Sequence, residues 1–129
     1  MPAANFPEYV QSLEDALHQA VATGEAVLTT LQVDQRSAIR GFIADSLQFQ
    51  DGSALHFREF VDTSQAEPRI MYVYQYQDAD HNLIFRYDNA VHRPALPQPE
   101  HKHSPSGVDI SPAPILPGVL DQILQRTNS

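Results

Sequence analysis

The sequence predicts an α+β fold: a curved antiparallel β-meander of about four to five strands, with an N-terminal helix and a C-terminal helix packed on it. Three observations support this prediction. Apolar residues recur at spacings of three and four near the N-terminus, alternate with polar residues through the middle of the chain, and return to helical spacing after the last proline. The chain has 129 residues, enough for one hydrophobic core, so a single domain over residues 1–129 is expected.

The first predicted element is a helix over residues 7–22. Its apolar residues line one face, namely Tyr9, Leu13, Ala16, Leu17, Ala20 and Val21. Glu8 complements the helix dipole near the N-terminus, and Gly24 predicts the end of the helix. Residues 28–31 stay apolar and fit either a second short helix or a first strand.

A sheet is predicted over residues 36–88. Apolar runs and alternation mark its strands, at 39–49, 54–61, 70–77 and 83–88. Asp51 and Gly52 between the first two strands predict a hairpin. Gly41 within the first strand is a candidate for a β-bulge.

Two features of the predicted sheet are open to more than one interpretation. Glu59 interrupts an apolar strand face, so it lies either at a sheet edge in water or buried with a partner such as Arg86 or a tyrosine hydroxyl. Tyr72, Tyr74 and Tyr76 form one stripe, which is typical of a sheet face packed on a helix. The same stripe could instead present rings that stack on unpaired bases.

The C-terminal third is rich in proline. Residues 92–117 hold seven of the ten prolines, which excludes a central strand or a helix interior there. We expect a Pro-rich active-site loop over 92–113, with short extended pieces at 101–103 and 108–110. Pro114 or Pro117 then opens a C-terminal helix over 114–126.

Composition narrows the functional classes. The net charge of −8 argues against non-specific binding to duplex nucleic acid, which requires dense neutralisation of phosphates. The chain has no cysteine, and we expect neither a signal peptide nor a transmembrane segment, so a cytoplasmic location is predicted. Residues 86–103 carry a net charge of +1, so the rest of the chain carries −9. A locally basic pocket on this acidic body could hold a phosphate group or one strand of RNA, and the acidic body suits a basic protein partner.

The strongest candidate for a site is the stretch from Arg86 to His103, where an apolar strand passes into a polar loop. Arg86 and Asp88 share a strand face, and His101 and His103 project from the same side of an extended chain. Side chains of these three types, arginine, aspartate and histidine, can bind phosphate, transfer protons or hold a metal. The alternative interpretation is an ion pair at the strand end followed by a solvated surface loop.

Three segments also carry a resemblance to a known family: Tyr72–Asp78, Leu83–Ala90 and Pro99–His103. The second contains an Arg-Tyr-Asp-Asn box and the third a His-x-His box, joined by the Pro-rich link. From about Ile43 to the C-terminus, the chain resembles the TumE-like toxin family of bacterial type II toxin–antitoxin systems.

The resemblance implies a single TumE-like domain over residues 1–129. It implies a small cytoplasmic toxin that a cognate helix-turn-helix antitoxin holds inactive. It supplies no chemical mechanism, which must be argued from the residues. This chain carries Gln75 where we expect many relatives to carry histidine, so no histidine acts at that point here.

The first hypothesis for the function is a metal-independent endoribonuclease, by analogy with other toxins of this general kind. RNA cleavage needs a base, an acid and cations on the phosphate. The predicted catalytic residues are His101, His103, Arg86, Asp88, Glu59 and Tyr74. The predicted substrate-binding residues are Lys102, Asn89 and His92. RNA is the expected substrate, no cofactor and no membrane partner are expected, and a homodimer remains open.

Two further hypotheses belong to other classes. A metal-binding hydrolase could use Asp88, His92, His101 and His103, whose mixed nitrogen and oxygen ligands suit zinc, manganese or nickel. A non-enzymatic interaction protein could instead act by binding its target through the acidic body and the tyrosine face.

Overall fold

The computed structural model describes residues 5–89, 101–110 and 113–127, and it confirms the α+β class. The elements along the chain are α1 (Phe6–Ala22), β1 (Leu28–Thr29), β2 (Gln32–Gln35), β3 (Arg40–Gln48), β4 (Ala54–Asp62), β5 (Arg69–Gln77), β6 (Leu83–Asp88), β7 (His101–Ser104), β8 (Gly107–Ile110) and α2 (Leu116–Thr127). The predicted helices and the four long strands are all present. The ambiguous run at residues 28–31 contains the strand β1. No helix among the described residues is long and apolar enough to cross a membrane.

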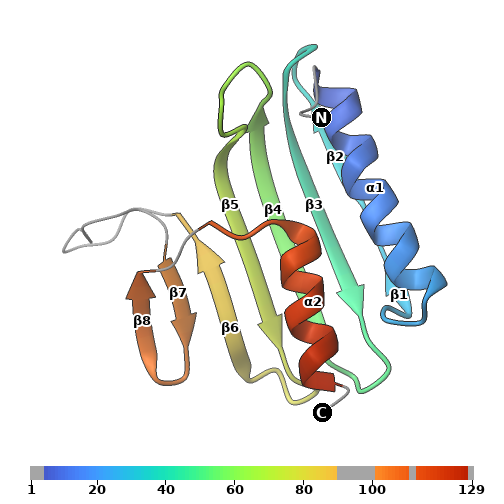
Figure 1. Ribbon diagram of the computed structural model, residues 1–129, viewed down its shortest axis with the longest axis vertical. Coiled ribbons are helices and arrows are strands. Elements are labelled where there is room, and N and C mark those ends of the chain that lie inside the picture. Colours follow the sequence, from blue (N-terminus) through green and yellow to red (C-terminus); the bar gives the residue numbers. More distant parts are fainter. Residues whose placement is uncertain (1–4, 90–100, 111–112, 128–129) are drawn as a thin grey trace.

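The strands form one antiparallel sheet of eight strands in the order β1-β3-β4-β5-β6-β7-β8, with β2 also paired to β3. The sheet is therefore wider than the predicted four to five strands. The additional strands are two to four residues long, and β2 is exposed along its whole length, so none shows the apolar alternation that marks a strand. Both short extended pieces predicted within the Pro-rich segment are strands, and together they form the β7–β8 hairpin at the sheet edge (Figure 1).

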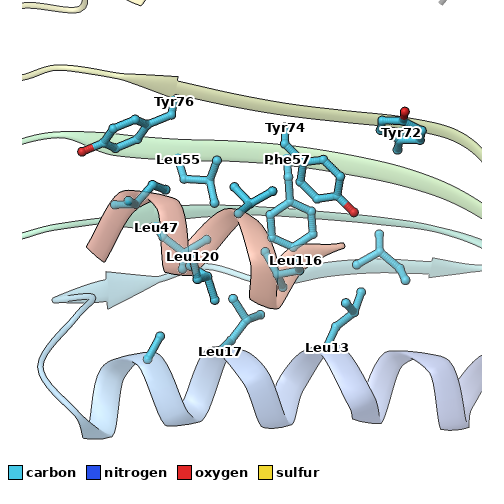
Figure 2. Packing of buried hydrophobic residues seen from close by; sticks show 14 of the residues in the cluster. Leu13, Leu17, Leu47, Leu55, Phe57, Tyr72, Tyr74, Tyr76, Leu116 and Leu120 are labelled. Carbon is cyan, nitrogen blue, oxygen red and sulfur yellow. The ribbon is translucent and has the colours of Figure 1, made fainter. Parts of the chain in front are cut away.

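Both helices pack on the same face of the sheet (Figure 1). The side chain of Asn5 caps α1 by accepting a hydrogen bond from the Glu8 amide at 2.9 Å. Figure 2 shows Leu13 and Leu17 of α1 and Leu116 of α2 meeting the inward side chains of the long strands. This arrangement leaves the opposite face of the sheet without a covering helix among the described residues.

The tyrosine stripe belongs to the core. Tyr72, Tyr74 and Tyr76 point toward the helices and are at most 2% exposed (Figure 2). Their hydroxyls need polar partners inside the protein, and Tyr76 donates to the Ser53 hydroxyl at 2.7 Å. Packing on a helix is confirmed for this stripe, and its use as a stacking platform for bases is wrong, because no base can reach the buried rings.

Gly41 does not mark a bulge. The pairing of β3 with β4 runs without a register shift from Arg40 to Gln48. A Cβ atom at Gly41 would instead lie 2.7 Å from Cε1 of the Phe6 ring, which is fully buried. Glycine is therefore required here because the first turn of α1 approaches the sheet closely.

The Gly41→Ala substitution is expected to lower the free energy of unfolding by about 1–3 kcal/mol, because the added methyl overpacks a closed contact. Chemical denaturation of the purified protein measures this loss. Gly118→Ala is a matched control, since a Cβ in this turn of α2 would meet only Ile115 at an ordinary 3.9 Å. The control is expected to be neutral or slightly stabilising, and an equal loss in both variants would contradict the explanation.

Candidate functional site

The uncovered face of the sheet brings three of the predicted site residues together. On β6, Phe85 and Tyr87 point into the core, so Arg86 and Asp88 project from the other face. The backbone of β7 pairs with β6 so that Arg86 lies opposite His103. Asp88 Oδ2 lies 2.9 Å from Nε of Arg86 and 3.2 Å from Nε2 of His103.

This Arg86–Asp88–His103 cluster differs from a fully exposed surface ion pair in the burial of its carboxylate. The Asp88 side chain is only 2% exposed, whereas Arg86 is 39% and His103 is 21% exposed. A buried carboxylate that contacts an imidazole can hold the ring in one orientation and stabilise positive charge on it. The accessible guanidinium next to it suits a phosphate group.

The structure does not describe the side chains of the other two histidines of the predicted site. His101 pairs with Asp88 in the backbone ladder between β6 and β7, and its side chain lies outside the described part. His92 lies entirely outside the described residues. Among the side chains that are described, no group of three or more potential metal ligands converges.

Lys102 and Asn89, both predicted to bind substrate, have contacts within the sheet, and their role in binding stays a prediction. The Lys102 ammonium lies 5.1 Å from the centre of the Tyr87 ring and 5.6 Å from that of Phe85, on the face opposite to His103. The Asn89 side chain accepts from the Tyr72 amide at 3.0 Å and donates to the Ile70 carbonyl at 3.1 Å. Asn89 thus extends the β5–β6 ladder beyond the end of β6.

Glu59 and Tyr74 form a second polar cluster, on the helix-covered face. Glu59 is 1% exposed, and its two carboxylate oxygens accept hydrogen bonds from the hydroxyls of Tyr9 and Tyr74. Arg69 donates to the Tyr74 hydroxyl at 3.1 Å and to the carbonyl of Pro114, just before α2. Of the partners predicted for Glu59, a tyrosine hydroxyl is correct and Arg86 is wrong, since Arg86 projects from the other face.

Burial dominates the electrostatics of this second cluster. Removal from water raises the pKa of Glu59, and the hydrogen bonds from Tyr74 and Tyr9 oppose that shift. Burial and the adjacent Glu59 carboxyl raise the pKa of Tyr74 and of Tyr9, so both hydroxyls keep their protons at neutral pH. The cluster ties α1, β4, β5 and the segment before α2 together, and the sheet separates it from Asp88 and His103.

Sequence reasoning missed a groove beside the Arg86–Asp88–His103 cluster. The groove has a volume of about 340 Å³, and its lining includes Ser46, His56, Arg58, Gln75 and Arg86. His56 lies on the surface, with Nδ1 2.8 Å from the Ser46 hydroxyl. Alternation in β4 already places His56 and Arg58 opposite to the core residues, but only strand register brings them to Arg86.

Comparison with known proteins agrees with the resemblance carried by the motifs. The family model described as Toxin TumE matches residues 6–127, which include α1, the whole sheet and α2. No curated protein and no solved structure matches the chain. A family match over nearly the whole chain shows that this protein belongs to the TumE family of toxins, which implies a toxin role and a cognate antitoxin.

Proposed function

We propose that this toxin is a metal-independent endoribonuclease whose active site lies on the uncovered face of the sheet. The observation that carries the proposal is the pair of contacts at Asp88, which joins a partly exposed imidazole to a partly exposed guanidinium through one buried carboxylate. General acid–base chemistry on a phosphodiester requires these group types in one place.

In the proposed reaction, a base removes the proton from a 2′-hydroxyl, whose oxygen then attacks the neighbouring phosphorus. The bond from phosphorus to the 5′-oxygen breaks, and an acid protonates that oxygen, leaving a 2′,3′-cyclic phosphate. His103 supplies one of the two proton-transfer groups, and we assign the other to His101, the neighbour of Asp88 in the strand ladder. Arg86 stabilises charge on the phosphate, and Asp88 orients His103.

The contacts at Asp88 favour this proposal over a metal-dependent hydrolase. Arg86 and His103 both contact the same carboxylate oxygen of Asp88, Oδ2. The positive charge of Arg86 at this oxygen repels a metal ion. The metal set of Asp88, His92, His101 and His103 stays an alternative. Cleavage that EDTA abolishes and one divalent metal restores would favour that set.

The partner that we propose is a helix-turn-helix antitoxin encoded beside the toxin gene. Expression of the toxin alone is expected to slow bacterial growth, and co-expression of the neighbouring gene product is expected to restore it. Normal growth at high, verified, soluble expression would count against the toxin role of this copy.

The His103→Ala substitution is expected to relieve growth inhibition without unfolding the protein. The His103 side chain lies on a short strand next to the sheet edge, on the uncovered face, and contributes little to the core, so the melting temperature should stay near that of the wild type. Growth rate on induction, RNA cleavage by the purified protein and a thermal melt provide the measurements.

His18→Ala is the matched control for that variant, because His18 is an exposed histidine on α1. It should remain fully toxic. If His103→Ala is also fully toxic while folded, the acid–base assignment fails and a toxin that acts by binding alone becomes the better explanation.

A further inference from the structure

The groove on the uncovered face continues the Arg86–Asp88–His103 cluster across the sheet. Strand register places Ser46 opposite His56, His56 opposite Gln75, Gln75 opposite Arg86, and Arg86 opposite His103. Directly paired residues of antiparallel strands share a face. One unbroken row of polar side chains therefore crosses five strands and ends at the cluster.

Two arginines line the groove, one within this row and one beside it. Arg58 on β4 and Arg86 on β6 both line the groove, and the strand between them contributes Val73 and Gln75. Adjacent strands lie about 4.8 Å apart, so the backbones of β4 and β6 are about 10 Å apart at this point. Two long guanidinium side chains at this separation can reach one anion above the uncharged strand between them.

The charges around the groove leave both arginines available to a ligand. Arg58 is exposed and forms no ion pair with any side chain in the described part of the molecule. Arg86 meets Asp88 through Nε, and its side chain stays 39% exposed. Among the described residues that line the groove, the one carboxyl is that of Asp45.

Asp45 does not present a negative charge to the groove. Its Oδ1 accepts from the Thr30 amide at 2.6 Å, and its Oδ2 is buried. Burial raises the pKa of this carboxyl, and the residue is only 4% exposed. The accessible polar groups of the groove are thus cationic or neutral on a protein whose net charge is −8.

We propose that the groove binds the phosphate backbone of single-stranded RNA, with Arg58 and Arg86 holding one phosphate beside His103. This inference rests on the proposed ribonuclease function and adds the path of the substrate strand. His56, whose Nδ1 is held by Ser46, is a second donor along that path. A single strand fits better than a duplex, since two arginines on an acidic body supply too few cations for dense duplex phosphates.

The test uses a fluorescent hexanucleotide of 2′-O-methyl RNA, which cannot be cleaved because its 2′-oxygens are blocked. Fluorescence anisotropy on the full chain gives the dissociation constant. Arg58→Ala is expected to weaken binding by about five- to tenfold and to reduce the salt dependence by about one phosphate contact. Arg58→Lys should keep most of the affinity, since the positive charge remains.

Two controls isolate the phosphate contact. Arg126→Ala removes the same charge on the helix-covered side, where Arg126 lies over the Tyr76 ring, and should change the dissociation constant less than about twofold. The same hexanucleotide with uncharged methylphosphonate linkages should bind much more weakly than the charged one. Thermal melts verify that each variant is folded.

The outcomes separate this inference from the ribonuclease proposal. Charge-dependent binding that Arg58→Ala weakens, without any cleavage of ordinary RNA, would support the groove and overturn the ribonuclease. Cleavage of ordinary RNA by the wild type, together with unchanged hexanucleotide affinity in Arg58→Ala, would support the ribonuclease and overturn the groove. If Arg58→Ala binds the hexanucleotide normally but escapes inhibition by the antitoxin, the groove is a protein interface and the inference is overturned.

Discussion

The Glu59→Ala substitution is expected to lower the free energy of unfolding by about 3–4 kcal/mol. The variant would leave the hydroxyls of Tyr9 and Tyr74 buried without their acceptor, and it would leave a cavity between α1 and β4. Urea denaturation followed by circular dichroism measures the change. A loss below about 1 kcal/mol would mean that the two tyrosines find other partners and that the cluster is not a structural centre.

Glu59→Gln is the informative companion, because it keeps the shape and removes the ionisation. The pKa of Glu59 is raised above its ordinary value of 4.5, mainly by burial, so the folded protein binds this proton more tightly than the unfolded chain does. The stability that Glu59 contributes is therefore complete below pH 4.5 and is lost as the pH rises through the folded pKa. The free energy of unfolding of the wild type, relative to that of Glu59→Gln, should therefore fall as the pH rises from 4.5 through the folded pKa. If the difference in stability between the two proteins stays constant or increases as the pH rises, the raised pKa of Glu59 is contradicted.

The second large effect is expected at Asp88. Asp88→Asn should reduce RNA cleavage by at least about 100-fold, as expected for a buried carboxylate that orients a catalytic histidine. It should also lower the stability by about 1–3 kcal/mol, less than for a fully buried pair because Arg86 is partly exposed. Cleavage assays and urea denaturation of the same preparation give both values.

A pH profile distinguishes positioning of His103 from a merely structural role of Asp88. Without the carboxylate, protonated His103 loses its counter-charge, so the histidine-dependent limb of the cleavage profile should move to lower pH. Asp62→Asn is a matched control, since Asp62 is also buried and paired with an arginine, Arg40, at 2.8 Å. Loss of cleavage in both variants to the same degree would indicate a general effect of stability.

The elements themselves could be predicted well because their signals are local. Helical spacing along α1 and alternation along β4 and β5 depend only on neighbouring residues, and both patterns match the structure at most positions. Val21 is the exception, because it was predicted on the apolar face of the helix and is 42% exposed. The short strands at the sheet edges could not be counted in this way. A strand of two to four residues such as β1 or β2 forms because the longer strand β3 offers it a hydrogen-bonding edge.

The candidate site was predicted in part. Arg86 and Asp88 were assigned to one strand face from alternation, and the structure places His103 against Asp88. The predicted catalytic set also included Glu59 and Tyr74, which lie on the helix-covered face. Their catalytic role stays a prediction, and any influence on His103 must pass through the sheet.

The sequence by itself determined the class of fold, the face of each long strand and the family, since all three are carried by residue types and spacings along the chain. Only the tertiary structure decided that Tyr9 and Tyr74 satisfy Glu59, that Phe6 requires Gly41, and that His56 and Arg58 line a groove beside Arg86. The physical reason is that these contacts depend on strand register and on helix packing. Both are set by the whole core at once, so no local pattern in the chain encodes them.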